Sequence, residues 1–286
     1  MDQFEEYRPL MFSIAYRMLG SVTDAEDIVQ NAYLRYSQMT PGSITSPKAF
    51  LSTVVTRLCL NHLQAAHTQR ESYLGPWLPE PLLTTDDDPQ SPTKHAEMLE
   101  SISMAFLVLL ERLTPVERAV FLLREVFDYP YPEIAAIVDK EEVTCRQIFS
   151  RAKKFIAEQH PRFTPSTEKH HQLLLRFMDA IKGEDLAGLT HLLASDVTMW
   201  ADGGGKIRGA ATRPLHGPQA VARFMIASLR FAQGTLTAEF REVNGEPAIV
   251  LREDGHPLVV VSVTIAQQHI QEIRVIGNPE KLRHIE

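Results

Sequence analysis

The sequence has little cysteine and no long apolar segment. Its two cysteines, Cys59 and Cys145, lack metal-ligand spacing, so we expect no disulfide framework, metal or cofactor, and both thiols are interpreted as small packing residues. No apolar run approaches the ~18 residues of a membrane span. The first ten residues, MDQFEEYRPL, lack the basic start and apolar centre of a signal peptide. These absences favour a reduced cytoplasm as the location.

Positive charge is scarce in the first part of the chain. Residues 1–160 hold 15 Lys and Arg against 22 Asp and Glu, a net charge of −7, whereas residues 161–286 hold 14 of each. Non-specific affinity for DNA comes mainly from neutralised phosphates. The first part should therefore bind free DNA poorly. If it reads DNA, we expect it to do so while held by another molecule.

Residues 131–154 nevertheless have the pattern of a helix-turn-helix. A short helix at Pro132–Val138 and a turn at Asp139–Glu142 precede a second helix. On a helical wheel of ~100° per residue, the apolar side of Val143–Phe155 gathers Cys145, Ile148, Phe149, Ala152 and Phe155. The other side gathers Arg146, Gln147, Ser150, Arg151, Lys153 and Lys154. Cations suit phosphates and forked donors suit base edges, so this side favours binding in a major groove. A core helix with a solvated basic face is the alternative.

A second pattern is an acidic helix face near the N-terminus. Between residues 24 and 36, one arc of the wheel is apolar, and the opposite arc holds Asp24, Glu26, Asp27, Gln30 and Asn31. This face is either simply solvated or complementary to a basic partner surface.

Breaks in the pattern divide the chain. Residues 4–70 have helical spacing, and residues 71–97 are rich in proline and include the acidic run Asp86–Asp88, which predicts a linker. Within the linker, WLPEP (Trp77–Pro81) is either packed locally or a docking motif. Helices are expected at Met98–Leu113 and from a capping box at Thr114–Glu117 to about Phe127. A second boundary is expected at His160–Thr167.

After the second boundary, the sequence pattern changes from all-helical to a mixture of helices and strands. Helices are expected at about 168–182 and 185–193, then a strand at Val197–Ala201 and a helix at about Pro218–Ala232. Four apolar or alternating segments follow, with hairpin turns at Asn244–Gly245 and Asp254–Gly255. Helices followed by an antiparallel sheet predict an α+β domain.

Three stretches in order resemble bacterial sigma factors. DAEDIVQNAYLRY is similar to the segment of region 2 that binds core RNA polymerase, and SPKAFLSTVVTRLCLNHL to the adjacent segment that reads the −10 element. LTPVERAVFLLREVFDYPYPEIAAIV with TCRQIFSRAKK is similar to region 4, which reads the −35 element. Two such regions joined by a short linker are typical of the extracytoplasmic-function (ECF) class. The resemblance covers residues 5–157 and explains the charge, because polymerase would supply the grip on DNA.

The C-terminal part resembles SnoaL-like domains of the NTF2-like fold, which one group of ECF factors carries. WLPEP, DGGGK (Asp202–Lys206) and NPEKL (Asn278–Leu282) are similar to signatures of that group. The resemblance implies two all-α domains, region 2 at 1–70 and region 4 at 98–160, with the linker at 71–97 between them. An NTF2-like α+β regulatory domain with a curved antiparallel sheet would follow at 166–286.

The resemblance also implies site residues. Core polymerase would be met by Asp24, Glu26, Asp27 and Gln30, and the −10 element by Arg57, Asn61 and His62. The −35 element would be contacted by Thr144, Arg146, Gln147, Ser150, Arg151, Lys153 and Lys154. The interdomain regulatory residues would be Trp77, Leu78, Pro79, Asp202, Gly203, Gly204, Gly205, Lys206, Asn278, Pro279, Lys281 and Leu282.

We therefore expect a sigma factor, not an enzyme, that binds core RNA polymerase and promoter DNA and is controlled in cis by its last domain. One hypothesis is that this domain docks on region 2 and the linker through Trp77–Pro81 and Asp202–Lys206, which holds the DNA-reading domains in an unsuitable arrangement. A second is that Asn278–Leu282 supports the active form. A small molecule in the C-terminal domain is a further possible partner.

Two other functions are open. One is a ligand-responsive repressor that binds DNA without polymerase. The other is a SnoaL-like enzyme fused to a DNA-binding region, for which Asp196, Asp202, His216 and His269 are residues of a suitable type. Fold similarity alone does not establish an activity.

Overall fold

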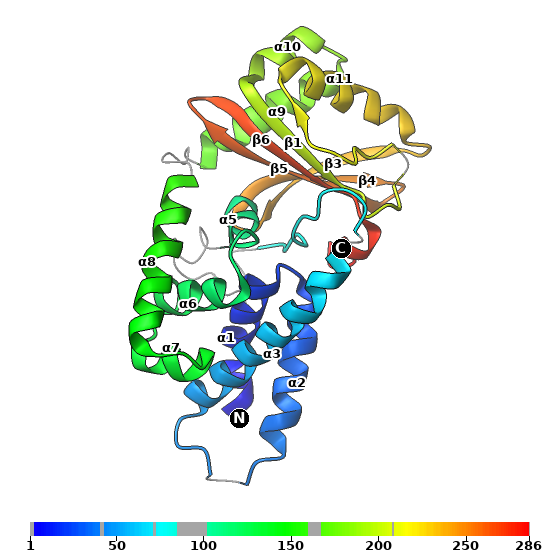
Figure 1. Ribbon diagram of the computed structural model, residues 1–286. Coiled ribbons are helices and arrows are strands. Elements are labelled where there is room, and N and C mark those ends of the chain that lie inside the picture. The colour runs from blue at the N-terminus through cyan, green and yellow to red at the C-terminus, as the bar shows by residue number, and fades with distance from the viewer. Residues whose placement is uncertain are drawn as a thin grey trace. The chain divides into compact units, whose positions relative to one another are not determined.

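The computed structural model describes residues 3–40, 43–70, 73–84, 102–159, 167–207 and 209–285. The chain forms two compact units, which we call the helical unit and the C-terminal unit (Figure 1). Residues up to 70 and those from 102 to 159 belong to the helical unit, whereas residues 73–84 belong with the C-terminal unit. In the part of the chain described, every helix is too short or too polar to cross a membrane. The acidic run Asp86–Asp88 and residues 160–166 of the expected second boundary lie outside the described residues.

The first helical group of the helical unit consists of α1 (Gln3–Leu19), α2 (Val22–Ser37) and α3 (Pro47–Arg70). Ser21 caps α2, because its side chain accepts a hydrogen bond from the Asp24 amide at 3.1 Å. The apolar side chains of the three helices, among them Ile28 and Val55, are buried against one another. This burial leaves the polar arc of α2 facing solvent.

The second helical group consists of α5 (Met104–Leu110), α6 (Pro115–Glu125), α7 (Tyr131–Val138) and α8 (Glu142–Gln159). The capping box predicted at Thr114 is confirmed, with Glu117 as its partner. α7 ends at Asp139, which has φ 54° and ψ 55°, and α8 begins three residues later. Aspartate adopts this left-handed conformation more readily than most residues, so the helix-turn-helix is made without glycine.

The C-terminal unit is an α+β domain, as predicted. It contains α9 (Thr167–Lys182), α10 (Leu186–Leu192), β1 (Leu193–Asp202), β2 (Leu215–His216), α11 (Pro218–Ser228), η1 (Leu229–Phe231), β3 (Leu236–Val243), β4 (Glu246–Glu253), β5 (His256–Ala266), β6 (His269–Ile276) and η2 (Pro279–Lys281). The six strands have the order β2-β1-β6-β5-β4-β3. All neighbours are antiparallel except β1 and β6, which are parallel.

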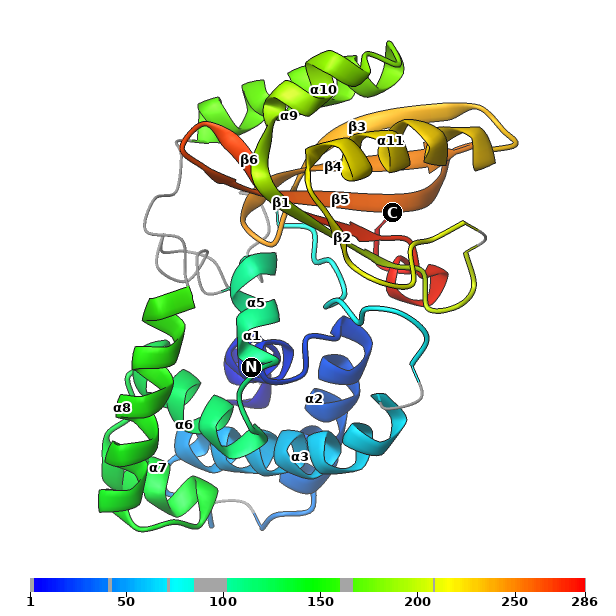
Figure 2. The same ribbon diagram turned by 45° about the horizontal axis from the view of Figure 1, so that its top comes forward.

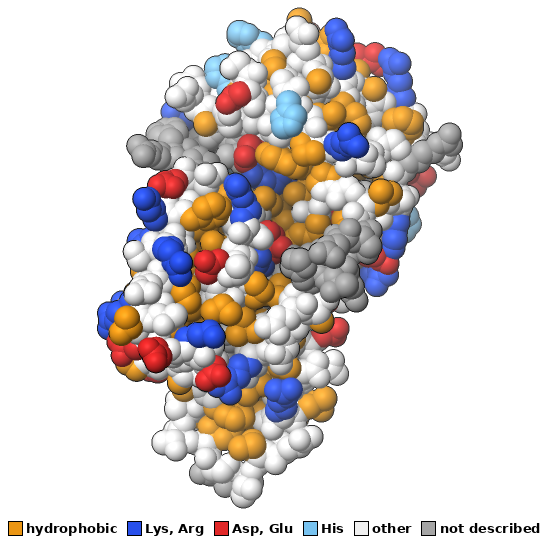
Figure 3. All heavy atoms as spheres, viewed as in Figure 1, with side chains coloured by type: hydrophobic (Ala, Val, Ile, Leu, Met, Phe, Trp, Pro, Cys, Tyr) orange, Lys and Arg blue, Asp and Glu red, His pale blue; other side chains and the backbone are white. Residues whose placement is uncertain are grey.

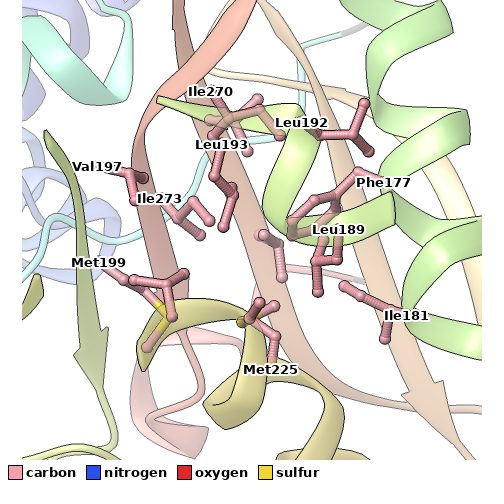
Figure 4. Close-up of a cluster of buried hydrophobic side chains, with 14 of the residues drawn as sticks. Phe177, Ile181, Leu189, Leu192, Leu193, Val197, Met199, Met225, Ile270 and Ile273 are labelled. Carbon is pink, nitrogen blue, oxygen red and sulfur yellow. The ribbon is translucent and has the colours of Figure 1, made fainter. Parts of the chain in front are cut away.

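The sheet is curved, and helices cover one of its faces. Register shifts interrupt three of the strand pairs, and such bulges bend a sheet. Figure 2 shows α9, α10 and α11 together on one side of the strands. The buried side chains between the layers include Phe177 from α9, Met225 from α11 and Ile273 from β6 (Figure 4). This is the curved-sheet architecture expected from the SnoaL-like resemblance.

Candidate functional site

The acidic face predicted on α2 is exposed. Glu26, Asp27 and Gln30 project into solvent, while Ile28 and Val29 are buried on the opposite side of the helix. Asp24 is half-buried, and its Oδ2 lies 3.5 Å from Nε2 of His62 on α3. The structure thus brings together a residue predicted to meet polymerase and one predicted to meet the −10 element.

The predicted −10 residues share one side of α3, but they have different surroundings. Arg57 and Asn61 are one helical turn apart, and both are exposed. The guanidinium of Arg57 donates from Nη2 to the carbonyl oxygen of Ala136 at 2.8 Å and from Nε to that of Ile137 at 3.1 Å. These carbonyls lie in the last turn of α7, where they have no partner inside the helix. Arg57 therefore joins the two helical groups of its unit.

Other contacts inside the helical unit join the same two groups. The hydroxyls of Ser52 and Tyr129 lie 2.6 Å apart and are buried. The buried Arg118 donates from Nη1 both to the carbonyl oxygen of Met18 and to Glu111, each at 2.6 Å. Regions predicted to read different promoter elements are thus packed together in this structure.

The reading face predicted on α8 is exposed along its length. Cys145, Ile148 and Ala152 are buried, as the wheel predicts, and the six polar residues from Arg146 to Lys154 are all exposed. Thr144 is half-buried. Figure 3 shows basic side chains mixed with acidic ones over the edge where α8 lies.

Three of the cations on α8 have acidic partners. Arg146 pairs with Glu142 at 2.5 Å, Lys153 with Glu125 at 2.8 Å, and Lys154 with Glu158 at 3.9 Å. Arg146 also lies over the ring of Tyr131, 4.3 Å from its centroid. The first residue of α8 therefore supplies the partner of a candidate reading residue. In the part of the chain described, the side chains of Gln147 and Arg151 have no such partner, which leaves them available to a ligand.

The three signatures WLPEP, DGGGK and NPEKL lie close together within the C-terminal unit. We call this place the linker-docking cluster, made of Tyr73 and residues 77–81, 202–206 and 278–282. Its centre is Asp202, which is 1% exposed at the end of β1. The Asp202 carboxylate accepts hydrogen bonds from the Tyr73 hydroxyl at 2.5 Å, the Leu78 amide at 2.8 Å, the Gly204 amide at 3.1 Å and Nζ of Lys281 at 2.7 Å.

Lys281 connects the same groups from the other side. Its Nζ is buried, donates to the carbonyl oxygen of Leu78, and lies 4.1 Å from the ring centroid of Trp77. A buried ammonium needs this compensation, because an unpaired charge is costly away from water. The side chain of Asn278 donates to the Tyr73 hydroxyl at 3.0 Å. Burial, and then the bond to Asp202, raise the pKa of Tyr73 above its ordinary value, so the phenol stays a donor.

The glycines of the cluster allow a close approach. Gly204 has φ +57°, and a Cβ built on it would lie 2.4 Å from Nδ2 of Asn278. Gly205 has φ +72° and lies against Leu74. At the rim, Lys206 pairs with Glu280 at 2.5 Å, and its hydrogen bond lowers the pKa of that carboxyl. The backbone of Asp202 accepts from the amides of Gly277 and Asn278, so the ends of β1 and β6 are joined.

A second attachment holds the linker further along. Asn244, which lies in a turn and has φ 54°, makes two hydrogen bonds with Leu82. Its backbone amide donates to the Leu82 carbonyl oxygen, and its Oδ1 accepts from the Leu82 amide at 3.1 Å. Leu83 forms an isolated antiparallel bridge with Val243. The Thr84 hydroxyl oxygen accepts a hydrogen bond from the Gly245 amide at 2.9 Å. The sequence predicted the turn at Asn244 but not its contact with the linker, and sequence reasoning missed Tyr73 and Thr84. The signal for Tyr73 was an aromatic residue in a proline-rich segment predicted to be a linker.

Comparison with known proteins identifies the two helical groups. A family model described as Sigma-70 region 2 matches residues 3–68, and one described as Sigma-70, region 4, matches residues 103–156. The fold and the two matched regions define a protein of the sigma-factor class.

Similarity to known proteins also extends over the C-terminal unit. The ECF RNA polymerase sigma factor SigJ of Mycobacterium tuberculosis is 35% identical over 292 residues, which cover 98% of this chain and 92% of SigJ. The crystal structure of SigJ superposes with a TM-score of 0.77 at 33% identity, covering 99% of this chain and 98% of that one. The probable ECF RNA polymerase sigma factor SigI of the same organism is 28% identical, with 96% of this chain and 92% of SigI covered. The chain belongs to the ECF RNA polymerase sigma factors.

Proposed function

We propose that the protein binds core RNA polymerase in the cytoplasm, directs initiation at its own promoters, and is controlled in cis through the linker-docking cluster. The exposed acidic face of α2 carries the polymerase contact, α3 the −10 contacts and α8 the −35 contacts. Family membership supports the first two statements, and the buried Asp202–Lys281 pair, which fixes the linker to the C-terminal unit, supports the third.

Docking of the linker limits how far regions 2 and 4 can separate. From residue 71 to residue 101 the free chain would have 31 residues, which reach about 105 Å when fully extended. Holding residues 73–84 on the C-terminal unit removes about 12 residues, or about 40 Å of extended reach, from this tether. Promoter binding needs the two regions on separate DNA elements. A shortened tether therefore favours the arrangement in which Arg57 caps α7 instead of meeting DNA.

A small molecule bound in the C-terminal unit is a natural signal for such control. Catalysis by Asp202 is not supported, because its carboxylate is already held by four donors. A repressor that binds DNA without polymerase is disfavoured by the net charge of −7 in residues 1–160.

The experiment that tests the function is binding to core RNA polymerase with charge reversal on α2. Glu26→Arg with Asp27→Arg should weaken binding at least tenfold, because like charges across an interface repel. The matched control, Glu5→Arg with Glu6→Arg, reverses two exposed acids on α1 and should bind like the wild type. Equal loss in both double variants, or tight binding of the wild type to promoter DNA without polymerase, contradicts the proposal.

Deleting residues 278–286 separates the two regulatory hypotheses. If the cluster only restrains the linker, the deletion should raise promoter-specific initiation in vitro. If Asn278–Leu282 supports the active form, initiation should fall although polymerase binding is kept.

A further inference from the structure

The C-terminal unit contains a cavity of about 420 Å³ between its helices and its sheet. α9, α11, η1 and the inner sides of β4, β5 and β6 form its walls, and the ends of β1 and β6 close one part of it. Phe177, Ile181 and Met225, drawn in Figure 4, extend into the space between helices and strands and line the cavity. The volume lies within the ~300–1,000 Å³ that small-molecule sites usually have.

The lining is mainly apolar, and most of its polar side chains have partners within the C-terminal unit. Ser228 donates to the Met225 carbonyl oxygen at 2.8 Å. One carboxylate oxygen of Glu253 accepts from the amides of Gln233 and Gly234. The Asp202 carboxylate is neutralised by Lys281. Arg230 also lies in the lining, but its side chain is exposed and pairs with Glu184 at 3.5 Å. The buried walls therefore offer an ion little to replace its hydration, and they favour an uncharged molecule.

Several lining residues are apolar and only partly buried, among them Phe224, Leu251 and Val259. Side chains of this kind present apolar surface to the cavity. Covering it with an apolar ligand is favourable, because apolar surface is removed from water. Gln233 stands exposed in the lining and offers a side-chain amide to one polar group of a ligand.

The cavity shares residues with the linker-docking cluster. Asp202 and Gly203 line the cavity, and the Asp202 carboxylate holds Leu78 and Tyr73 of the linker. Gly277 also lines it, and its amide donates to the Asp202 carbonyl oxygen at 2.8 Å. A molecule packed in the cavity therefore touches the backbone that positions the centre of the cluster.

We infer that this cavity binds an uncharged, mainly apolar small molecule, and that the bound molecule strengthens docking of the linker. The cavity exists with the linker docked, so a ligand that fits it favours that state over one in which Asp202 and Gly203 have moved. The regulatory meaning of this coupling rests on the proposed function, whereas the binding itself does not.

The first test is titration of the full-length protein with Nile red, an uncharged dye that fluoresces in apolar surroundings. We expect saturable binding of one dye per chain. Val259→Phe fills the cavity and should weaken binding at least tenfold. Leu175→Phe, on the exposed side of α9 and outside the lining, should leave it unchanged. Leu251→Phe is the second filling variant if circular dichroism shows that Val259→Phe does not fold. No saturable binding, or equal binding in the filled and control variants, overturns the site.

The second test measures coupling by amide hydrogen exchange of the Leu78 and Leu82 amides, which donate to Asp202 and Asn244. Saturating Nile red should slow exchange of both at least tenfold in the wild type and not in Val259→Phe, while the Ile148 amide of α8 should not respond. Equal rates with and without bound dye overturn the coupling. Neither measurement uses polymerase or DNA, so a failure here leaves the initiation function intact, and a failure of polymerase binding leaves this site intact.

Discussion

Arg57 on α3 donates from Nε to the carbonyl oxygen of Ile137, at 3.1 Å, in the last turn of α7. A residue predicted for the −10 element is thus bound to the helix that precedes the −35 reading helix. The two bonds to α7 use Nε and Nη2 of the guanidinium, so a forked contact of Arg57 with a base through the same atoms would have to replace them. If Arg57 contacts the −10 element, as proposed, we expect promoter binding to compete with the packing of the two helical groups.

Arg57→Ala should loosen that packing, whereas Asn61→Ala should not. Two partly exposed hydrogen bonds to orphan carbonyls are worth about 1 kcal/mol together, so α7 amides should exchange several-fold faster. Asn61 is exposed one turn away and serves as the control. Both variants should weaken initiation at the −10 element. Unchanged exchange in Arg57→Ala would show that the other contacts, such as Ser52 with Tyr129, hold the groups together alone.

Gly204→Ala should undock the linker, whereas Gly255→Ala should not. Both positions have positive φ, so both substitutions carry a backbone cost of about 1–2 kcal/mol. Only at Gly204 does the new Cβ meet Asn278, at 2.4 Å; at Gly255 it meets nothing within 4 Å. Limited proteolysis should cut residues 73–84 faster in the first variant, and initiation by the reconstituted holoenzyme should rise. The idea of restraint fails if proteolysis accelerates and initiation does not change.

On α8, Arg151→Ala should relax base specificity, whereas Lys154→Ala should weaken binding evenly. Arg151 is exposed and without a partner among the described residues, and a forked base contact discriminates by about 1–3 kcal/mol. Lys154 has only a loose pair with Glu158 at 3.9 Å, which suits a phosphate contact. Holoenzyme affinity for a set of −35 variants at several salt concentrations distinguishes the two roles. The assignment is wrong if both substitutions change all sequences equally.

The C-terminal unit should lose stability below neutral pH because of His170. This residue of α9 is buried, and its Nε2 has no hydrogen-bond partner among the described atoms. Burial, with a smaller effect of His171, lowers its pKa to about 4. The unfolded chain protonates this histidine near pH 6.5 and the folded chain does not, so stability falls as the pH drops from 6.5 toward 4. Between pH 7 and pH 5 the loss is about 2 kcal/mol.

Urea unfolding of the full chain at those two pH values measures this loss. His170→Leu should remove it, and His191→Leu, which changes an exposed histidine of α10, should keep it. An equal pH dependence in both variants would assign the effect to other groups.

Local patterns in the sequence predict most of the fold, because they reflect short-range physics. The apolar arc of α8, the capping box at Thr114 and the hairpin turn at Asn244 depend on residues within one or two turns of each other. The parallel pairing of β1 with β6 was not predictable in this way, since it joins strands that are far apart in the sequence.

The functional surfaces were predictable as motifs but not as contacts. The exposure of Asp27 and Arg151 follows from helical periodicity. The convergence of Tyr73, Asp202 and Lys281 does not, because these residues are separated by up to 208 positions and meet only through the fold of the C-terminal unit. The capping of α7 by Arg57 is equally long-range, and no single motif contains both partners.

The position of Lys281 in the chain has a consequence for biosynthesis. Chains generally fold from the N-terminal end as they leave the ribosome. The segments that bind polymerase and DNA are translated before Asp202, and the ammonium group that completes the linker-docking cluster is translated after all of them. A nascent or prematurely terminated chain would therefore carry both DNA-reading regions without its restraint. Under the proposed function, restraint of the linker requires translation through Lys281, and chains that end before it would lack that restraint.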